Sequence, residues 1–288
     1  MLELIVNGIV LGSIIALGAV GLSMAYGILN FANFSHGDLM ALGAYLAFFF
    51  KFAIGMPFLL AAAAAVASTA AVAVLIDKIL YNPLRRVENP IILLISSVGV
   101  ALIIRNLIRL FWGPQIRYYD RSIQMAYVLP GGVRIKPNQI LILCVAAAMV
   151  AGLHLFLTKT RTGKAMRAAS DNSELAKISG IDLDRIVIFT WILSVSLAAT
   201  GGILLGMDVQ LRPVMGWNLL LPIFAAAILG GIGRPYGAIA GGLIIGLAQE
   251  ISTAFFSTAY KPAFAFIIML IVLLIRPAGI FGVSGRWT

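Results

Sequence analysis

Long, uninterrupted runs of apolar residues dominate the chain and limit what it can fold into. Most runs approach the roughly 20 residues that a helix needs to cross the hydrocarbon core of a bilayer. A transmembrane β-barrel is excluded because its strands would alternate apolar and polar residues. The sequence therefore predicts an all-α polytopic membrane protein with eight or nine transmembrane helices. The candidate spans are residues 4–25, 37–54, 57–78, 91–111, 138–158, 186–206, 217–232, 236–256 and 262–276.

Composition supports the same class of protein. The chain is 61% hydrophobic and 11% charged, whereas a soluble domain has roughly 25% charged residues. A net charge of +10 is typical of loops held at the cytoplasmic face by Lys and Arg, so no nucleic-acid partner is expected. Cys144 is the single cysteine, which excludes an intrachain disulfide and a cysteine metal site. We expect no cofactor and no metal in this chain.

One strongly polar stretch, residues 160–185, interrupts the apolar runs. It holds five Lys or Arg residues and four acids, a density of charge that cannot lie in hydrocarbon. We place it inside together with the cationic residues 85–86 and the tail after residue 275. Nine crossings then put the N-terminus and residues 112–137 outside. The first apolar run lacks a basic leader and is expected to be the first span rather than a cleaved signal peptide.

Two pairs of apolar runs are separated by residues that break helices. Residues 26–38 contain glycine, two asparagines and Ser35 followed by Asp38, a pattern typical of a helix end and a new N-cap. Residues 228–242 contain six glycines and a proline. Either break could be an ordinary turn, or a discontinuous helix that lines a translocation path between two inverted repeats divided near residues 112–137. The predicted path residues are Asn30, Asn33, His36, Gly37, Gly230, Gly231, Gly233 and Gly237.

The first span also carries glycines at spacings that let a second helix approach closely. These are Gly8, Gly12, Gly18 and Gly21.

Few charges lie inside the apolar runs, and each is a functional candidate. Arg105 and Arg109 share a helix face near the end of their span, so both are expected to extend to the outer headgroups. Glu250 lies deep in its span, and Gln249 beside it indicates a polar packing seam. Asp208 is a further candidate. No ladder of acids suggests a proton relay, which disfavours a proton-coupled carrier.

No catalytic motif is present, so the chain is not expected to be an enzyme. His36 and His154 stand apart and belong to no metal-binding motif. An intramembrane hydrolase is disfavoured for want of a Ser/His or Asp pair. Gly163-Lys164-Ala165 lacks the first glycine and the hydroxyl of a phosphate-binding loop. If transport is driven by ATP, another subunit must hydrolyse it.

The polar stretch itself predicts two short helices joined by a corner at residues 170–172. Asp171 and Glu174 resemble a capping box, and Gly180 is a natural C-terminal stop. Apolar side chains among the charges favour a docking element over a merely solvated loop. These side chains are Met166, Ala169, Leu175 and Ile178.

Within this stretch, Glu174-x-Ala176-x-x-x-Gly180 resembles the "EAA" cytoplasmic loop of binding-protein-dependent ABC permeases. The longer run 167–181 resembles branched-chain amino acid permeases of the LivH type. Thr190 stands where the classical loop has Ile, a departure that weakens the generic match more than the specific one. Further matches cover essentially the whole chain. They lie at residues 30–45, 227–242 and 276–282.

The resemblance implies a single permease domain, residues 1–288, of a bacterial inner-membrane importer. It implies a heterodimer with a second homologous permease, two ABC ATPase subunits, and an extracytoplasmic binding protein that delivers neutral, mainly aliphatic amino acids. Residues 160–185 would then be the cytoplasmic coupling loop, moved by the ATPases during alternating access. The alternatives are a permease for urea or short amides and a stand-alone carrier or channel. The implied ATPase-coupling residues are Arg167, Ala168, Ala169, Asp171, Glu174, Ala176 and Gly180.

Overall fold

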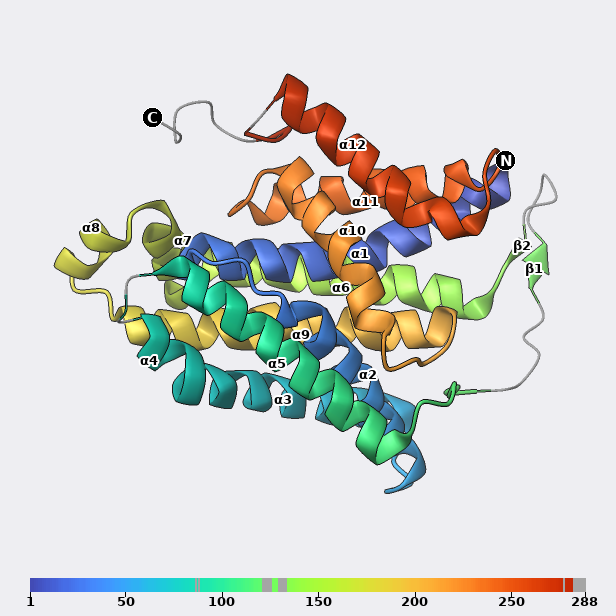
Figure 1. Cartoon of the computed structure of the whole chain (residues 1–288), viewed down its shortest axis with the longest axis horizontal. Coiled ribbons are helices and arrows are strands. Elements are labelled where there is room, and N and C mark those ends of the chain that lie inside the picture. The colour runs from blue at the N-terminus through green and yellow to red at the C-terminus, as the bar shows by residue number, and fades with distance from the viewer. Residues whose placement is uncertain (86, 88, 121–125, 129–133, 277, 282–288) are drawn as a thin grey trace.

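A computed structural model describes residues 1–288 apart from 86, 88, 121–125, 129–133, 277 and 282–288. Each predicted apolar run forms a helix, and these helices lie roughly along one another in a bundle (Figure 1). They are α1 (Leu2–Leu29), α2 (Ser35–Phe52), α3 (Phe58–Ile76), α5 (Pro90–Trp112), α6 (Pro137–Lys159), α9 (Leu183–Asp208), α10 (Met215–Gly230), α11 (Pro235–Ser252) and α12 (Lys261–Ile275).

Shorter elements join or extend these helices. A π-helical stretch, η1 (Asp77–Tyr81), and α4 (Asn82–Arg85) prolong α3, and a 3₁₀ turn, η2 (Thr258–Tyr260), precedes α12. The polar stretch forms α7 (Arg161–Asp171) and α8 (Ser173–Ile178). Strands β1 (Tyr127–Val128) and β2 (Arg134–Ile135) pair antiparallel, with Tyr127 opposite Ile135.

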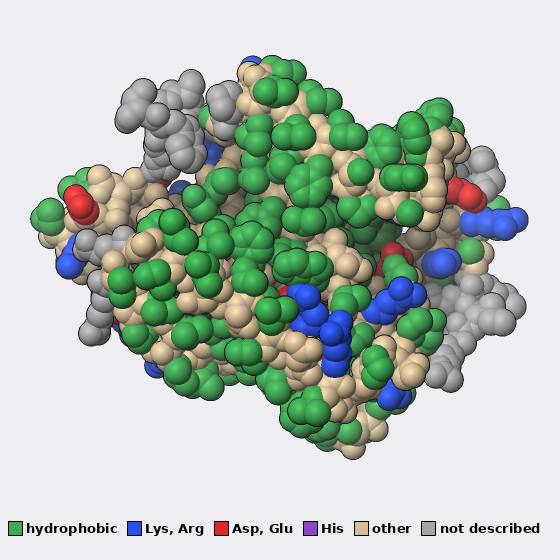
Figure 2. Space-filling view, viewed as in Figure 1, with side chains coloured by type: hydrophobic (Ala, Val, Ile, Leu, Met, Phe, Trp, Pro, Cys, Tyr) green, Lys and Arg blue, Asp and Glu red, His purple; other side chains and the backbone are tan. Residues whose placement is uncertain are grey.

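The prediction of an all-α polytopic membrane protein is confirmed. In the described part of the chain, six helices are long and apolar enough to cross a membrane, and α10 is apolar but has 16 residues. Apolar side chains cover most of the face in Figure 2, and charged side chains gather mainly over its right-hand half and at its left end. The six helices are Leu2–Leu29, Phe58–Arg85, Pro90–Trp112, Pro137–Lys159, Leu183–Asp208 and Thr258–Ile275.

The centre of the bundle is formed by α1 and α9. In the most apolar stretch of each of these helices, 61% of the residues are buried. The corresponding share is 6% in the C-terminal span at the edge of the bundle. The predicted close packing of α1 is confirmed. A side chain on Gly246 of α11 would overlap with the backbone of Gly12, and a Cβ on Gly21 would lie 2.5 Å from the carbonyl oxygen of Ser194 in α9. Small residues therefore let α9 and α11 meet α1 at backbone distance.

A similar contact joins the start of α2 to the start of α10. A Cβ on Gly216 would overlap with the carbonyl group of Gly37, so Gly216→Val must force the two helices apart. We expect this substitution to cost about 1–3 kcal/mol of stability. The measurement is the thermal midpoint of the protein purified in detergent. Gly152→Val in α6 is the matched control, because no atom lies within 4 Å of a Cβ there. Equal midpoints for the two variants would contradict the contact.

The bundle has two distinct ends. Helices α7 and α8 lie at one end, and the N-terminus and the β1–β2 hairpin lie at the other (Figure 1). This arrangement separates the polar segment of α7 and α8 from the loops that follow α5 and α9 by the full length of the bundle.

Candidate functional site

The predicted corner in the polar stretch is confirmed, and side chains cap both of its helices. Thr160 Oγ1 accepts a hydrogen bond from the Gly163 amide at 2.9 Å, which starts α7. Asn172 Oδ1 accepts from the Leu175 amide at 2.9 Å, which starts α8. The predicted capping box at Asp171 is therefore wrong by one residue. Asn172 is the first residue with extended backbone after α7, and only such a residue can turn its side chain toward the new helix.

Gly180 ends α8 as predicted. Its φ is +84°, a conformation that side chains disfavour. The Gly180 amide donates to Lys177 O at 3.1 Å, and the Ile181 amide donates to Ala176 O at 3.0 Å. This pair of hydrogen bonds satisfies two carbonyl groups that the helix end would otherwise leave free.

The apolar side chains of this segment divide between two surfaces. Met166 and Ala169 of α7 are buried against the bundle, as is Ala176 of α8. Leu175 is 61% exposed and Ile178 is 84% exposed, and both project from α8 among charged neighbours. Of the predicted coupling residues, Ala169 and Ala176 are buried and pack against the bundle. The exposed ones are Arg167, Ala168, Asp171, Glu174 and Gly180.

Helix α7 lies against the first helix break and shares a cavity with the second. A Cβ on Gly27, near the end of α1, would lie 2.9 Å from Ser170 Oγ and 3.1 Å from the Cα of Gly233. A cavity of about 450 Å³ lies between these elements. The structure thus places part of the polar segment and the second break around one cavity. The cavity is lined by predicted residues of both groups, Arg167, Asp171, Gly233 and Gly237 among them.

The first break enters the core of the bundle. Asn30 adopts a left-handed conformation (φ +54°), and the chain then runs back into the middle of the bundle, where α2 begins (Figure 1). Asn33 is buried, and its Oδ1 accepts from the Ser35 amide at 3.0 Å and from Ser35 Oγ at 2.7 Å. Asn33 therefore holds the first residue of α2 in place, one position before the N-cap residue Phe34. The predicted cap formed by Ser35 and Asp38 is wrong, because Ser35 already lies inside the helix.

Other predicted path residues lie where two helices touch. His36 is fully buried, with Nε2 2.9 Å from Gly18 O. The nearest atoms to a Cβ on Gly37 belong to Gly216, whereas those near Gly230 belong to Gly237. The two breaks meet at Gly27 and Gly233, but the structure does not bring the predicted path residues of the first break into one site with those of the second. Positive φ values of 96° and 81° at Gly231 and Gly233 form the turn between α10 and α11.

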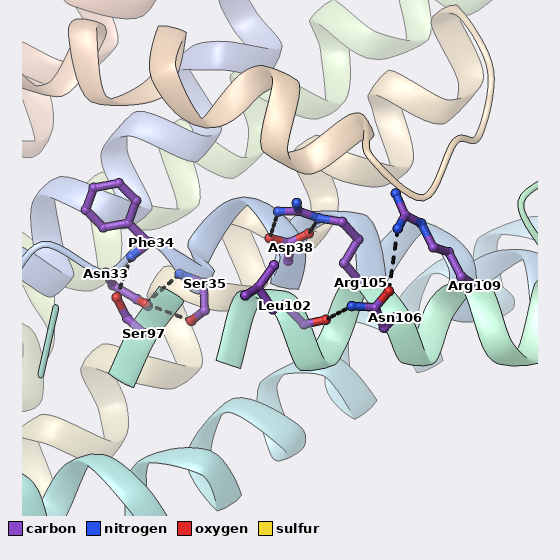
Figure 3. Close-up of polar contacts among 9 residues, drawn as sticks. All are labelled: Asn33, Phe34, Ser35, Asp38, Ser97, Leu102, Arg105, Asn106 and Arg109. Carbon is purple, nitrogen blue, oxygen red and sulfur yellow. Dashed lines mark hydrogen bonds and ion pairs between the residues drawn. The ribbon is translucent and has the colours of Figure 1, made fainter. Parts of the chain in front are cut away.

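A buried ion pair joins α2 to α5 (Figure 3). Arg105 Nε donates to Asp38 Oδ1 at 2.9 Å, and Nη2 donates to Oδ2 at 2.8 Å. The side chains of Arg105 and Asp38 are 10% and 0% exposed, and the guanidinium lies 4.5 Å from the ring centre of Trp217 in α10. The predicted position of Arg105 at the headgroups is therefore wrong, because a buried carboxylate holds it inside. Arg109 remains exposed.

Sequence reasoning missed this pair because Asp38 looked like a local cap. A signal did exist: Asp38 and Arg105 are opposite charges inside two predicted spans, and such charges tend to pair with each other.

Polar side chains also gather at the end of the bundle away from α7. Lys261 Nζ lies 2.5 Å from Glu250 Oε1, and Gln249, 3% exposed, donates to Lys261 O at 3.2 Å. The predicted polar seam at Gln249 is confirmed. Gln139 donates to Asn7 Oδ1 at 2.9 Å, which ties α6 to α1. Among the described residues, no group of His, Cys, Asp and Glu could hold a metal ion.

This fold and these sites define an integral membrane protein with a charged helical segment, α7 and α8, at one end of its bundle. Residues 4–273 match the family described as branched-chain amino acid transport system / permease component. The chain belongs to this family.

Curated relatives match over nearly their whole length. The chain is 34% identical to the high-affinity branched-chain amino acid transport system permease protein BraD of Pseudomonas aeruginosa, covering 98% of this chain and 95% of the relative. It is 33% identical, with the same coverage, to LivH of Escherichia coli K12. A probable LivH permease of Methanocaldococcus jannaschii is 30% identical over 99% of this chain and 94% of its own.

A solved structure shares the fold. PsaBC from Streptococcus pneumoniae in complex with Fab superposes with a TM-score of 0.53, covering 94% of this chain and 91% of that chain. The sequence identity is 14%, so the likeness concerns the fold alone.

Proposed function

We propose that this chain is the membrane-spanning permease subunit of an ATP-driven importer of neutral, mainly branched-chain amino acids in the bacterial inner membrane. One observation carries the proposal: permeases of high-affinity branched-chain amino acid transport systems match the chain from end to end. ATP hydrolysis belongs to separate subunits. The polar segment offers no phosphate-binding motif for the nucleotide.

The proposed partners are a second homologous permease, two ABC ATPase subunits and an extracytoplasmic binding protein. Helices α7 and α8, within the coupling loop of residues 160–185, are the proposed docking element for one ATPase. The exposed side chains of Leu175 and Ile178 support this role, because apolar residues on a charged, water-facing helix favour burial against another protein. Arg167, Asp171 and Glu174 would supply the polar rim.

We further propose a single domain of residues 1–288 with eight or nine crossings, the N-terminus outside and α7–α8 inside. Helices α2 and α11 have 18 residues each and α10 has 16, short for full spans. The buried start of α2 supports a discontinuous segment there. Two inverted repeats divided near residues 112–137 remain part of this proposal.

Transport would follow from movement of α7. Closure of the ATPases would push this helix, whose Ser170 lies against Gly27, and Gly27 in turn lies against Gly233. The force would reach the end of α1 and the turn between α10 and α11, and rock the helices between outward- and inward-facing states. The two breaks would border the passage. Their proposed path residues are Asn30, Asn33, His36, Gly37, Gly230, Gly231, Gly233 and Gly237.

Reconstitution of the complete complex in liposomes tests the proposal. We expect the binding protein loaded with leucine to stimulate both ATP hydrolysis and leucine uptake. Equal stimulation by every solute, or by urea and short amides instead of leucine, would contradict the substrate. Uptake by the purified single chain without ATPase subunits would contradict the ATP-driven class and support a stand-alone carrier.

A further inference from the structure

Two neighbouring cavities open at the end of the bundle opposite α7. One has a volume of about 550 Å³ and the other about 350 Å³, and Lys136, Asp208 and Val209 line both. Lys136 precedes α6 and Asp208 closes α9, whereas α7 and α8 follow α6 and precede α9. The cavities therefore lie at the other end of the bundle, where Figure 2 shows a hollow in the surface. Their sizes are those of small-molecule sites.

The side chain of Asp208 has no direct partner in these cavities. No described residue hydrogen-bonds or ion-pairs with its carboxylate, although the charges of Lys136, Glu250 and Lys261 act on it. Lys261 is already bonded to Glu250 at 2.5 Å. A half-buried carboxylate gains most from a cation that can enter and contact it directly.

Lys136 supplies the opposite charge. Its ammonium group makes no hydrogen bond or ion pair with any described side chain, and it lines both cavities. The shared wall thus presents an acceptor for a cation and a donor for an anion. A ligand that carries one charge of each sign would form an ion pair with both. A neutral amide could only hydrogen-bond to them and would bind more weakly.

Apolar side chains also line the smaller cavity. They include Leu11 of α1 and Leu219 and Pro222 of α10. Leu219 and Pro222 are buried and Leu11 is partly buried. This surface suits an aliphatic side chain, since burial of each CH₂ group contributes to affinity.

We propose that these cavities bind a zwitterionic aliphatic amino acid at the entrance to the permease. Asp208 accepts hydrogen bonds from the α-ammonium group, Lys136 donates to the α-carboxylate, and Leu11, Leu219 and Pro222 contact the side chain. The proposal rests on the amino-acid transport function and adds a substrate site within the membrane subunit itself. It assigns the choice of zwitterions over amides to this chain.

The test is binding of radiolabelled leucine to the purified complex of permeases and ATPases, with the binding protein omitted. We expect Asp208→Asn and Lys136→Gln each to weaken binding about 10- to 100-fold, because each removes one charge-assisted hydrogen bond. Glu3→Gln and Lys78→Gln are the matched controls, since both residues are exposed and line neither cavity. The controls should bind leucine like the unaltered complex.

Leucine analogues separate loss of recognition from loss of folding. 4-Methylpentanoate lacks the ammonium group, and 3-methylbutylamine lacks the carboxylate. Asp208→Asn should leave competition by 4-methylpentanoate unchanged, and Lys136→Gln should leave competition by the amine unchanged. If the variants do not assemble, competition for leucine binding to the unaltered complex still tests the site. The site requires both analogues to compete at least tenfold more weakly than leucine.

Three results would overturn the site. These are leucine binding by both variants at the level of the controls, equal competition by leucine and both analogues, and no leucine binding by a complex that transports leucine. In each case the proposed function stands if reconstituted uptake of leucine is normal. Absence of amino-acid uptake by the unaltered complete transporter would instead refute the function and the site together.

Discussion

Replacement of Arg105 by leucine is expected to destabilise the folded protein by about 3–5 kcal/mol. The substitution leaves the Asp38 carboxylate, whose side chain is 0% exposed, without its counter-ion in the interior of the bundle. It also removes the guanidinium from the face of Trp217. The measurement is the thermal midpoint of the protein in detergent, followed by the fraction that remains monodisperse on size-exclusion chromatography.

Two further variants identify the ion pair as the cause. Arg109→Leu, one turn along α5 and exposed, should have a much smaller effect. The double variant Asp38→Leu with Arg105→Leu should recover much of the stability, because it leaves no buried charge unpaired. A double variant as unstable as Arg105→Leu alone would show that the charges themselves are not what the fold requires.

Substitution of Gly180 by proline is expected to reduce uptake by the complete transporter to near background while ATP hydrolysis continues. Proline cannot adopt the φ of +84° found at this position, and it lacks the amide that donates to Lys177 O. The end of α8 and the exposed Leu175 and Ile178 would therefore shift relative to the bundle. The measurement is the ratio of leucine transported to ATP hydrolysed in liposomes.

Gly113 offers a matched control for this substitution. It also has a positive φ (+79°), and its amide donates to Arg109 O at the end of α5, but it lies far from α8. Gly113→Pro should leave the transport ratio unchanged, whatever its effect on yield. Glu174→Lys should also uncouple transport, since it reverses an exposed charge without disturbing the backbone. Normal ratios in both Gly180→Pro and Glu174→Lys would refute mechanical coupling through α8.

The helices of this protein could be predicted from sequence because each is an apolar run with polar or glycine-rich ends. The predicted span 91–111 corresponds to Pro90–Trp112, and 138–158 corresponds to Pro137–Lys159. The glycines of α1 predicted that other helices pack closely against it, because only small side chains permit such contact. Which helices would supply the partners could not be inferred, because that depends on contacts between distant parts of the chain.

Sites were predictable where their determinants are local. The corner between α7 and α8 and the stop at Gly180 depend on a few neighbouring residues, and even there the cap moved by one residue to Asn172. The pair of Asp38 and Arg105 lies 67 residues apart in sequence. Local rules assigned the first to a cap and the second to the membrane surface. The cavity wall formed by Lys136 and Asp208 also combines residues far apart in sequence, since Lys136 precedes α6 and Asp208 ends α9.

The packing of α1 against α11 has a consequence for how this protein is made. Gly8 and Gly12 meet Gly242 and Leu247 with no room for larger side chains, yet roughly 200 residues separate Leu29 from Pro235. At about 5–20 residues per second, the ribosome needs on the order of 10–40 s to synthesise that interval. During that time the glycine-lined face of α1 must be covered by lipid or by the insertion machinery. Helix α1 is thus synthesised before the other described helices but meets α11 only after most of them have been made.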